Sequence, residues 1–167
     1  MYQLIVAVFA IAIAATLVAG GVTYLNTDIG VRSATADSVV AGERAFNLAL
    51  GAYRVANSGA VPGKMTWLSD LAPYFPAGHA TLLEGGRLGG VMLPPRGMTW
   101  IYDLDGAGKP FLCLRNEDGV QIGQAVHDGL AGIVGRTAGY LGKVCGGEPN
   151  LVYDGQVALT FTLQAGL

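Results

Sequence analysis

The residues of this chain that could carry covalent chemistry are its two cysteines, Cys113 and Cys145. They either join in a disulfide or remain as two buried free thiols. An apolar N-terminal segment of the kind that directs export precedes them, and disulfides form in exported domains. A bridge would close a loop of about 30 residues and contribute about 3–4 kcal/mol in the chain-entropy treatment. The sequence therefore predicts a Cys113–Cys145 disulfide.

Other chemical patterns are incomplete. Residues 106–109 (GAGK) resemble the end of a phosphate loop, but Pro110 follows where Ser or Thr is required. Asp103 and Asp105 lack the twelve-residue spacing and closing Glu of a calcium loop. Both patterns fit a hairpin turn better than a binding site. We therefore expect no metal and no cofactor.

The two histidines, His79 and His127, lie far apart and outside any metal-ligand spacing. His127 precedes Asp128 on an expected helix, where adjacent side chains point in different directions, so we expect it at the surface. Without a coherent nucleophile, base or metal set, we expect no catalytic residues and no enzymatic turnover. Four aromatic residues could line a sugar-binding patch, but we favour an aromatic core as their role: Trp67, Tyr74, Trp100 and Tyr102.

Composition limits the class of protein. The chain has 167 residues, a formal net charge of −2 and 13% charged residues, against about 25% in a typical soluble domain. No cluster of Lys and Arg is present, so nucleic acid is not expected as a partner. Such a weakly charged surface suits a protein buried in an assembly, or simply a bacterial sequence rich in Gly and Ala.

Residues 4–25 form the longest apolar segment, with no charge until Asp28. As a helix, these roughly 22 residues span about 33 Å, enough to cross a hydrocarbon core. A cleavable signal peptide is less favoured, because no Lys or Arg precedes the segment and its Ala-x-Ala sites lie mid-segment. We therefore expect residues 1–26 to be the transmembrane half of a helix, and residues 27–167 to form one extracytoplasmic domain.

The helix is expected to continue to about residue 57, with a flexible point at Gly20 and Gly21. Val39, Phe46 and Tyr53 recur every seven residues and predict a buried stripe. A short helix over 66–71, capped by Thr66, and an irregular stretch over 77–97 should follow. Later elements are a hairpin of 98–102 with 111–114, a helix from Asn116 to about Leu141, and a second hairpin of 151–153 with 156–164 that turns at Asp154 and Gly155.

These elements predict an α+β fold. A long N-terminal helix, transmembrane and then amphipathic, should pack on a small antiparallel sheet, with a second helix between the hairpins.

Residues 2–13 (YQLIVAVFAIAI) resemble the mature N-terminus of type IV pilins, and Leu4, Ile5 and residues 11–13 match in register. Val6 stands where the family has a Glu, or Ile5 does if Met1 is the first mature residue. No basic leader ending in Gly precedes the segment. The cysteines bracket the second helix, as in type IVb pilins.

The resemblance implies a minor pilin or pilin-like component of a type IV pilus or related filament. Its expected partners are other pilin subunits, inner-membrane proteins of pilus assembly and membrane lipid. Its expected place is the bacterial inner membrane with an extracytoplasmic domain, or the extracellular filament. Small residues on one helix face, Ala7, Ala14 and Gly21, would allow close helix packing. Two alternatives remain open: an unprocessed inner-membrane accessory of a conjugative thin pilus, and an unrelated membrane-anchored periplasmic binding or adhesion domain.

Overall fold

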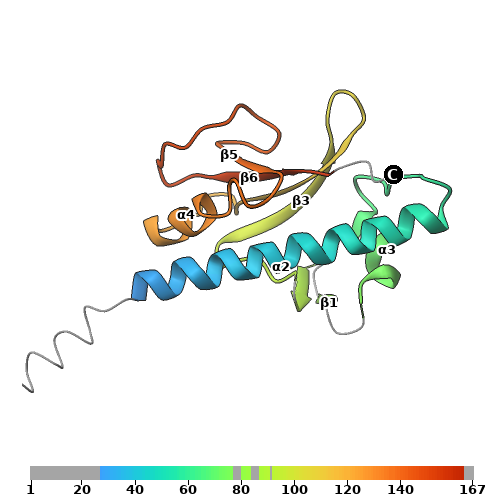
Figure 1. The fold of residues 1–167 in the computed structure, drawn as a ribbon, viewed down its shortest axis with the longest axis horizontal. Helices are drawn as coiled ribbons and strands as arrows, with labels where there is room; N and C mark the ends of the chain where they lie inside the picture. Colours follow the sequence, from blue (N-terminus) through green and yellow to red (C-terminus); the bar gives the residue numbers. More distant parts are fainter. Residues whose placement is uncertain (1–26, 77–79, 84–86, 91, 164–167) are drawn as a thin grey trace, which may run out of the picture.

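A long helix crosses a four-stranded antiparallel sheet in the computed structural model, which describes residues 27–76, 80–83, 87–90 and 92–163 (Figure 1). The predicted combination of a long helix, an antiparallel sheet and a second helix is confirmed. The helices are α2 (Thr27–Ala56), α3 (Trp67–Leu71), the 3-10 turn η1 (Ala72–Tyr74) and α4 (Gln124–Ala131). The strands are β1 (Ala80–Leu83), β2 (Arg87–Gly90), β3 (Met98–Leu104), β4 (Pro110–Asn116), β5 (Gly139–Gly142) and β6 (Ala158–Thr162).

The predicted membrane segment lies outside the described residues. These begin at Thr27, and none of their helices is both long enough and apolar enough to cross a membrane. The flexible point and the helix assembly face predicted for this segment also lie outside them, namely Val6, Ala7, Ala14, Gly20 and Gly21.

Helix α2 buries the predicted stripe. Val39 and Phe46 are fully buried and Leu50 nearly so, while Tyr53 is half-buried against the same core. The helix ends where Ser58 and Gly59 adopt positive φ values of 54° and 85°. The Gly59 N–H then donates to the Arg54 carbonyl at 2.7 Å, which closes the last turn. The predicted extent of this helix is therefore confirmed from Thr27 onward.

The sheet has the strand order β3-β4-β6-β5. Its register aligns Trp100, Leu114, Leu159 and Leu141 across the four strands, and all four are buried. The neighbouring positions, Ile101, Cys113, Thr160 and Tyr140, form a second cross-strand row, which lies on the opposite face because successive side chains alternate. The sheet thus has a core face toward α2 and an outer face centred on Cys113.

Several local predictions were wrong. Residues 80–83 and 87–90, expected within an irregular stretch, pair as the antiparallel strands β1 and β2. The helix predicted from Asn116 to Leu141 shortens to α4, because Gly132 and Gly135 interrupt it and Gly135 adopts a φ of +91°. Residues 151–153 form no strand, and β6 pairs instead with β4 and β5. Thr66 makes no capping bond to the backbone, and its hydroxyl donates to Asp70 at 2.7 Å.

Helix α4 lies directly on the N-terminal half of α2 (Figure 1). The contact depends on Gly129, because a Cβ placed there would lie 2.7 Å from the Arg32 carbonyl oxygen and 3.1 Å from the Thr35 Cβ. Beside it, the Arg32 guanidinium pairs with Asp128 at 2.7 Å. The absence of a side chain at Gly129 therefore sets the distance between the two helices.

Gly129→Ala should lower the free energy of unfolding by about 1–3 kcal/mol, because the added methyl must push α4 away from the α2 backbone. Gly51→Ala is the matched control, since a Cβ at Gly51 meets nothing within 4 Å. That change should stabilise the helix by about 0.5–1 kcal/mol. Chemical denaturation of both variants measures the difference. Equal stabilisation by the two changes would show that α4 does not pack on α2 at this distance.

Candidate functional site

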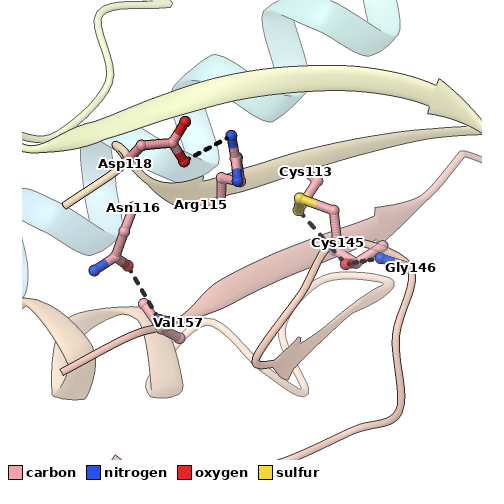
Figure 2. The surroundings of a disulfide bond; sticks show 8 residues. Cys113, Arg115, Asn116, Asp118, Cys145, Gly146 and Val157 are labelled. Atoms are coloured by element: carbon pink, nitrogen blue, oxygen red, sulfur yellow. Dashed lines mark hydrogen bonds and ion pairs between the residues drawn. A yellow bond between two sulfur atoms is a disulfide. The ribbon is translucent and has the colours of Figure 1, made fainter. Parts of the chain in front are cut away.

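The predicted disulfide between Cys113 and Cys145 is confirmed, with a Cα–Cα distance of 5.7 Å and a sequence separation of 32 (Figure 2). Cys113 is fully buried on the outer face of the sheet. The Thr160 hydroxyl donates to the Cys113 sulfur at 3.7 Å and accepts the Gly146 N–H at 3.1 Å. The disulfide and these hydrogen bonds hold the 143–149 loop against β4 and β6.

A groove of about 440 Å³ lies beside this loop. Its charges are largely compensated, because Lys64 pairs with Asp103 at 2.5 Å and Arg115 pairs with Asp118 at 3.2 Å. Figure 2 shows the Arg115–Asp118 pair. The Lys64 hydrogen bond lowers the pKa of the exposed Asp103 carboxyl. No aromatic side chain lines the groove among the described residues, so it lacks the stacking platform expected of a sugar site.

The aromatic residues considered for a sugar patch belong to the core. Trp67, Trp100 and Tyr102 are each less than 8% exposed. The rings of Phe46, Trp67 and Tyr102 form a triangle, with the Phe46 centroid 5.6 Å from Trp67 and 5.8 Å from Tyr102, and 6.0 Å between the last two. Burial raises the pKa of Tyr102 to about 12. Tyr74 is half-buried and packs edge-on against Tyr53. The core interpretation of these residues is therefore confirmed.

His127 is buried, and its predicted surface position was wrong. Its ring packs on Tyr153 with centroids 5.1 Å apart, and Nδ1 lies 3.5 Å from an Asp128 oxygen. The cause is the 151–156 loop, which covers this face of α4 and is held there by a hydrogen bond from Tyr153 to the Ile122 carbonyl. The Asp128 carboxylate pairs with Arg32 and accepts a hydrogen bond from Gln124. The Gln124 hydrogen bond is the main cause of the lowered pKa of Asp128.

Two other predicted patterns now have structural roles. The GAGK segment forms the β3–β4 turn, where Asp105 Oδ1 accepts the N–H groups of Ala107 and Lys109. Asn116 caps no helix. Its side-chain amide joins the end of β4 to the Val120 and Gly155 carbonyls and the Val157 N–H. His79 lies outside the described residues, and within them no group of three or more His, Cys, Asp or Glu side chains could hold a metal.

The outer face of α2, turned away from the core, carries exposed apolar residues in its C-terminal half. Leu48 and Val55 are 66% and 87% exposed, and the exposed Gly51 and Ala52 lie between them. This i, i+3, i+4, i+7 spacing places the four residues in one stripe on the helix. A helix that is apolar on two faces has a second packing surface besides its own core.

A groove of about 300 Å³ lies alongside this face, between α2 and the segment after α4. We call it the α2 groove. Its apolar lining includes Val40, Ala41 and Ile133, and its charged residues are Asp37, Arg44 and Arg136. Sequence reasoning missed this site because Arg136 was expected inside a long helix, although the seven-residue spacing of Ala41, Leu48 and Val55 was visible.

The arrangement provides a packing surface along α2. It combines an exposed apolar helix face with a charged groove. No family of known proteins, no curated protein and no solved structure matches the chain.

Proposed function

We propose that this chain is a structural subunit, a minor pilin or pilin-like component, of a type IV pilus or related filament. It assembles through its N-terminal hydrophobic helix and carries out no enzymatic turnover. The observation that carries the proposal is the succession of an apolar membrane-length segment and α2, a helix of 30 residues with an exposed apolar outer face. A long helix with one face on its own sheet and another in solvent is suited to packing against neighbouring subunits.

The N-terminal end of α2 supports this proposal. Residues 28–34 are all exposed, and in Figure 1 the first turns of α2 extend beyond the sheet. The apolar segment therefore precedes an exposed helix end, which α4 contacts from Arg32 onward. Exposed side chains such as Leu48 and Val55 leave an apolar surface on the same helix that is available to a neighbouring subunit.

The proposed partners are other pilin subunits, inner-membrane proteins of pilus assembly and membrane lipid. Lipid tails are as apolar as the side chains, so moving apolar side chains from lipid into a helix interface contributes little free energy. Helix association in lipid therefore depends on close packing of small residues. Ala7, Ala14 and Gly21 would supply that packing surface. The disulfide fits an extracytoplasmic domain in the inner membrane or the extracellular filament, where oxidising conditions allow it to persist.

Replacing Ala7, Ala14 and Gly21 together by leucine tests the proposal. The segment stays apolar and should still insert. The bulkier side chains should lower crosslinking to partner pilins, and incorporation into sheared filaments, by about tenfold or more because the helices can no longer approach closely. The matched control replaces Ala12, Ala15 and Ala19 by leucine, which adds nearly the same bulk on a different helix face.

The control should keep its crosslinks and its place in the filament. Undiminished assembly of the first variant would reduce the segment to a plain anchor and favour an unrelated periplasmic domain. Crosslinks to inner-membrane proteins, with no subunit in sheared filaments for either the wild type or the control, would favour the accessory of a conjugative pilus.

A further inference from the structure

We propose that the α2 groove binds the α2 helix of a second copy of this chain. The two helices run parallel and are displaced along their axes by one heptad. Asp37 of one copy then pairs with Arg44 and Arg136 of the next. The parallel direction rests on the proposed function, because both copies would carry their N-terminal segments into the same membrane. The pairing itself rests on the residues around the groove.

The charges of the α2 groove are available to a partner. Asp37, Arg44 and Arg136 are all exposed. Within the described part of the chain, no ion pair includes any of the three, although five other such contacts form. The groove thus presents two guanidinium groups and one carboxylate beside an apolar lining. A carboxylate carried on an apolar helix is the chemical complement of the two guanidinium groups in the groove.

The outer face of α2 repeats every seven residues. Ala34, Ala41, Leu48 and Val55 form one row, and Asp37 and Arg44 occupy corresponding positions in the next. Seven residues advance about 10 Å along a helix and return to nearly the same face. A second α2 displaced by about 10 Å therefore presents the same row of side chains. Its Asp37 then lies level with Arg44 of the first copy.

This displacement decides between the parallel arrangements. With no displacement, Asp37 would face Asp37 and Arg44 would face Arg44, and like charges placed together are strongly unfavourable. With a displacement of one heptad, Asp37 lies level with Arg44, which favours the pair. Ala41 then lies level with Leu48, so a small side chain faces a large one. Both the charges and the side-chain sizes match in the displaced arrangement.

Cysteine crosslinking of the full-length chain in membranes tests the displacement. One tagged copy carries Leu48→Cys and the other carries Val55→Cys, and both native cysteines are already joined to each other. We expect a strong 48–55 product on oxidation and little product from two copies that both carry Leu48→Cys. An antiparallel pair with Asp37 opposite Arg44 would keep 48 and 55 apart, so it cannot produce this result.

Charge reversal tests the ion pair. Asp37→Arg should lower the 48–55 product about tenfold, because it places like charges together. Adding Arg44→Asp to the same chain should restore most of it. Arg96→Asp, an exposed change outside α2, should leave it unchanged. Three results would each overturn the inference: a dominant 48–48 product, crosslinks only to a different protein, or a 48–55 yield that Asp37→Arg does not change. Copies carrying Val6→Cys that still crosslink to pilus subunits, without a 48–55 product, would overturn it and leave the proposed function standing.

Discussion

Phe46→Ala should lower the free energy of unfolding by about 3–5 kcal/mol, the range typical of a large aromatic side chain truncated in a core. Phe46 has no solvent exposure, and its ring contacts both Trp67 of α3 and Tyr102 of β3. Its removal leaves a cavity where α2, α3 and the sheet meet, and it breaks two aromatic contacts at once. Urea denaturation measures the loss, and near-ultraviolet circular dichroism reports the surroundings of Trp67.

Leu48→Ala is the matched control for Phe46→Ala. It truncates a large apolar residue on the same helix, but Leu48 is 66% exposed. A surface change of this kind should alter stability by only about 0.5 kcal/mol. Equal losses for the two variants would mean that α2 does not pack on the sheet through the Phe46 face. A stable Leu48→Ala variant that assembles poorly would instead separate the assembly role of the outer face from folding.

The elements that could be predicted are those whose pattern is local. The buried stripe of α2 follows from apolar residues at helical spacing, and Val39 and Phe46 occupy it as expected. The β3–β4 hairpin follows from two apolar segments around a turn that begins at Asp105, whose side chain bonds to the turn backbone. The disulfide follows from having two cysteines and a likeness to exported proteins.

Strand β5 could not be predicted because nothing local specifies it. It spans Gly139–Gly142, with a glycine at each end and no alternation of apolar and polar residues. It becomes a strand because β6 offers it a pairing partner, which places Leu141 opposite Leu159. Residues 151–153, which were predicted to pair with β6, form no strand for a related reason. Gly155 does adopt a positive φ, but the loop there is held by Asn116, which binds the Gly155 carbonyl and the Val157 N–H.

The candidate site likewise has one part that a local sequence pattern predicts and one part that depends on tertiary structure. The apolar row of Ala34, Ala41, Leu48 and Val55 can be found in the sequence, because a heptad needs no tertiary information. The groove beside it cannot, since Arg136 reaches α2 only after α4 ends early and the chain turns at Gly135. Gly129 is a further example. It looks like a poor helix residue, yet its contact with the Arg32 carbonyl explains why a side chain there is unfavourable.

Replacing both Cys113 and Cys145 by alanine should lower the free energy of unfolding by about 3–4 kcal/mol. The bridge closes a loop with a sequence separation of 32, and its loss lets the unfolded chain sample many more conformations. For a domain of this size the melting temperature should fall by about 10 °C. Alanine at both positions avoids leaving one thiol buried at Cys113, which is fully enclosed.

Reduction of the wild-type protein separates the crosslink from the packing of its sulfur atoms. Under a strong reductant the wild type should lose about the same stability as the double variant, whereas the double variant should not respond. Protein denatured without reductant should show no titratable thiol, because both cysteines are consumed in the bridge. Two titratable thiols would contradict the disulfide. They would also weaken the extracytoplasmic placement on which the proposed pilus function depends, since a reducing compartment keeps such thiols free.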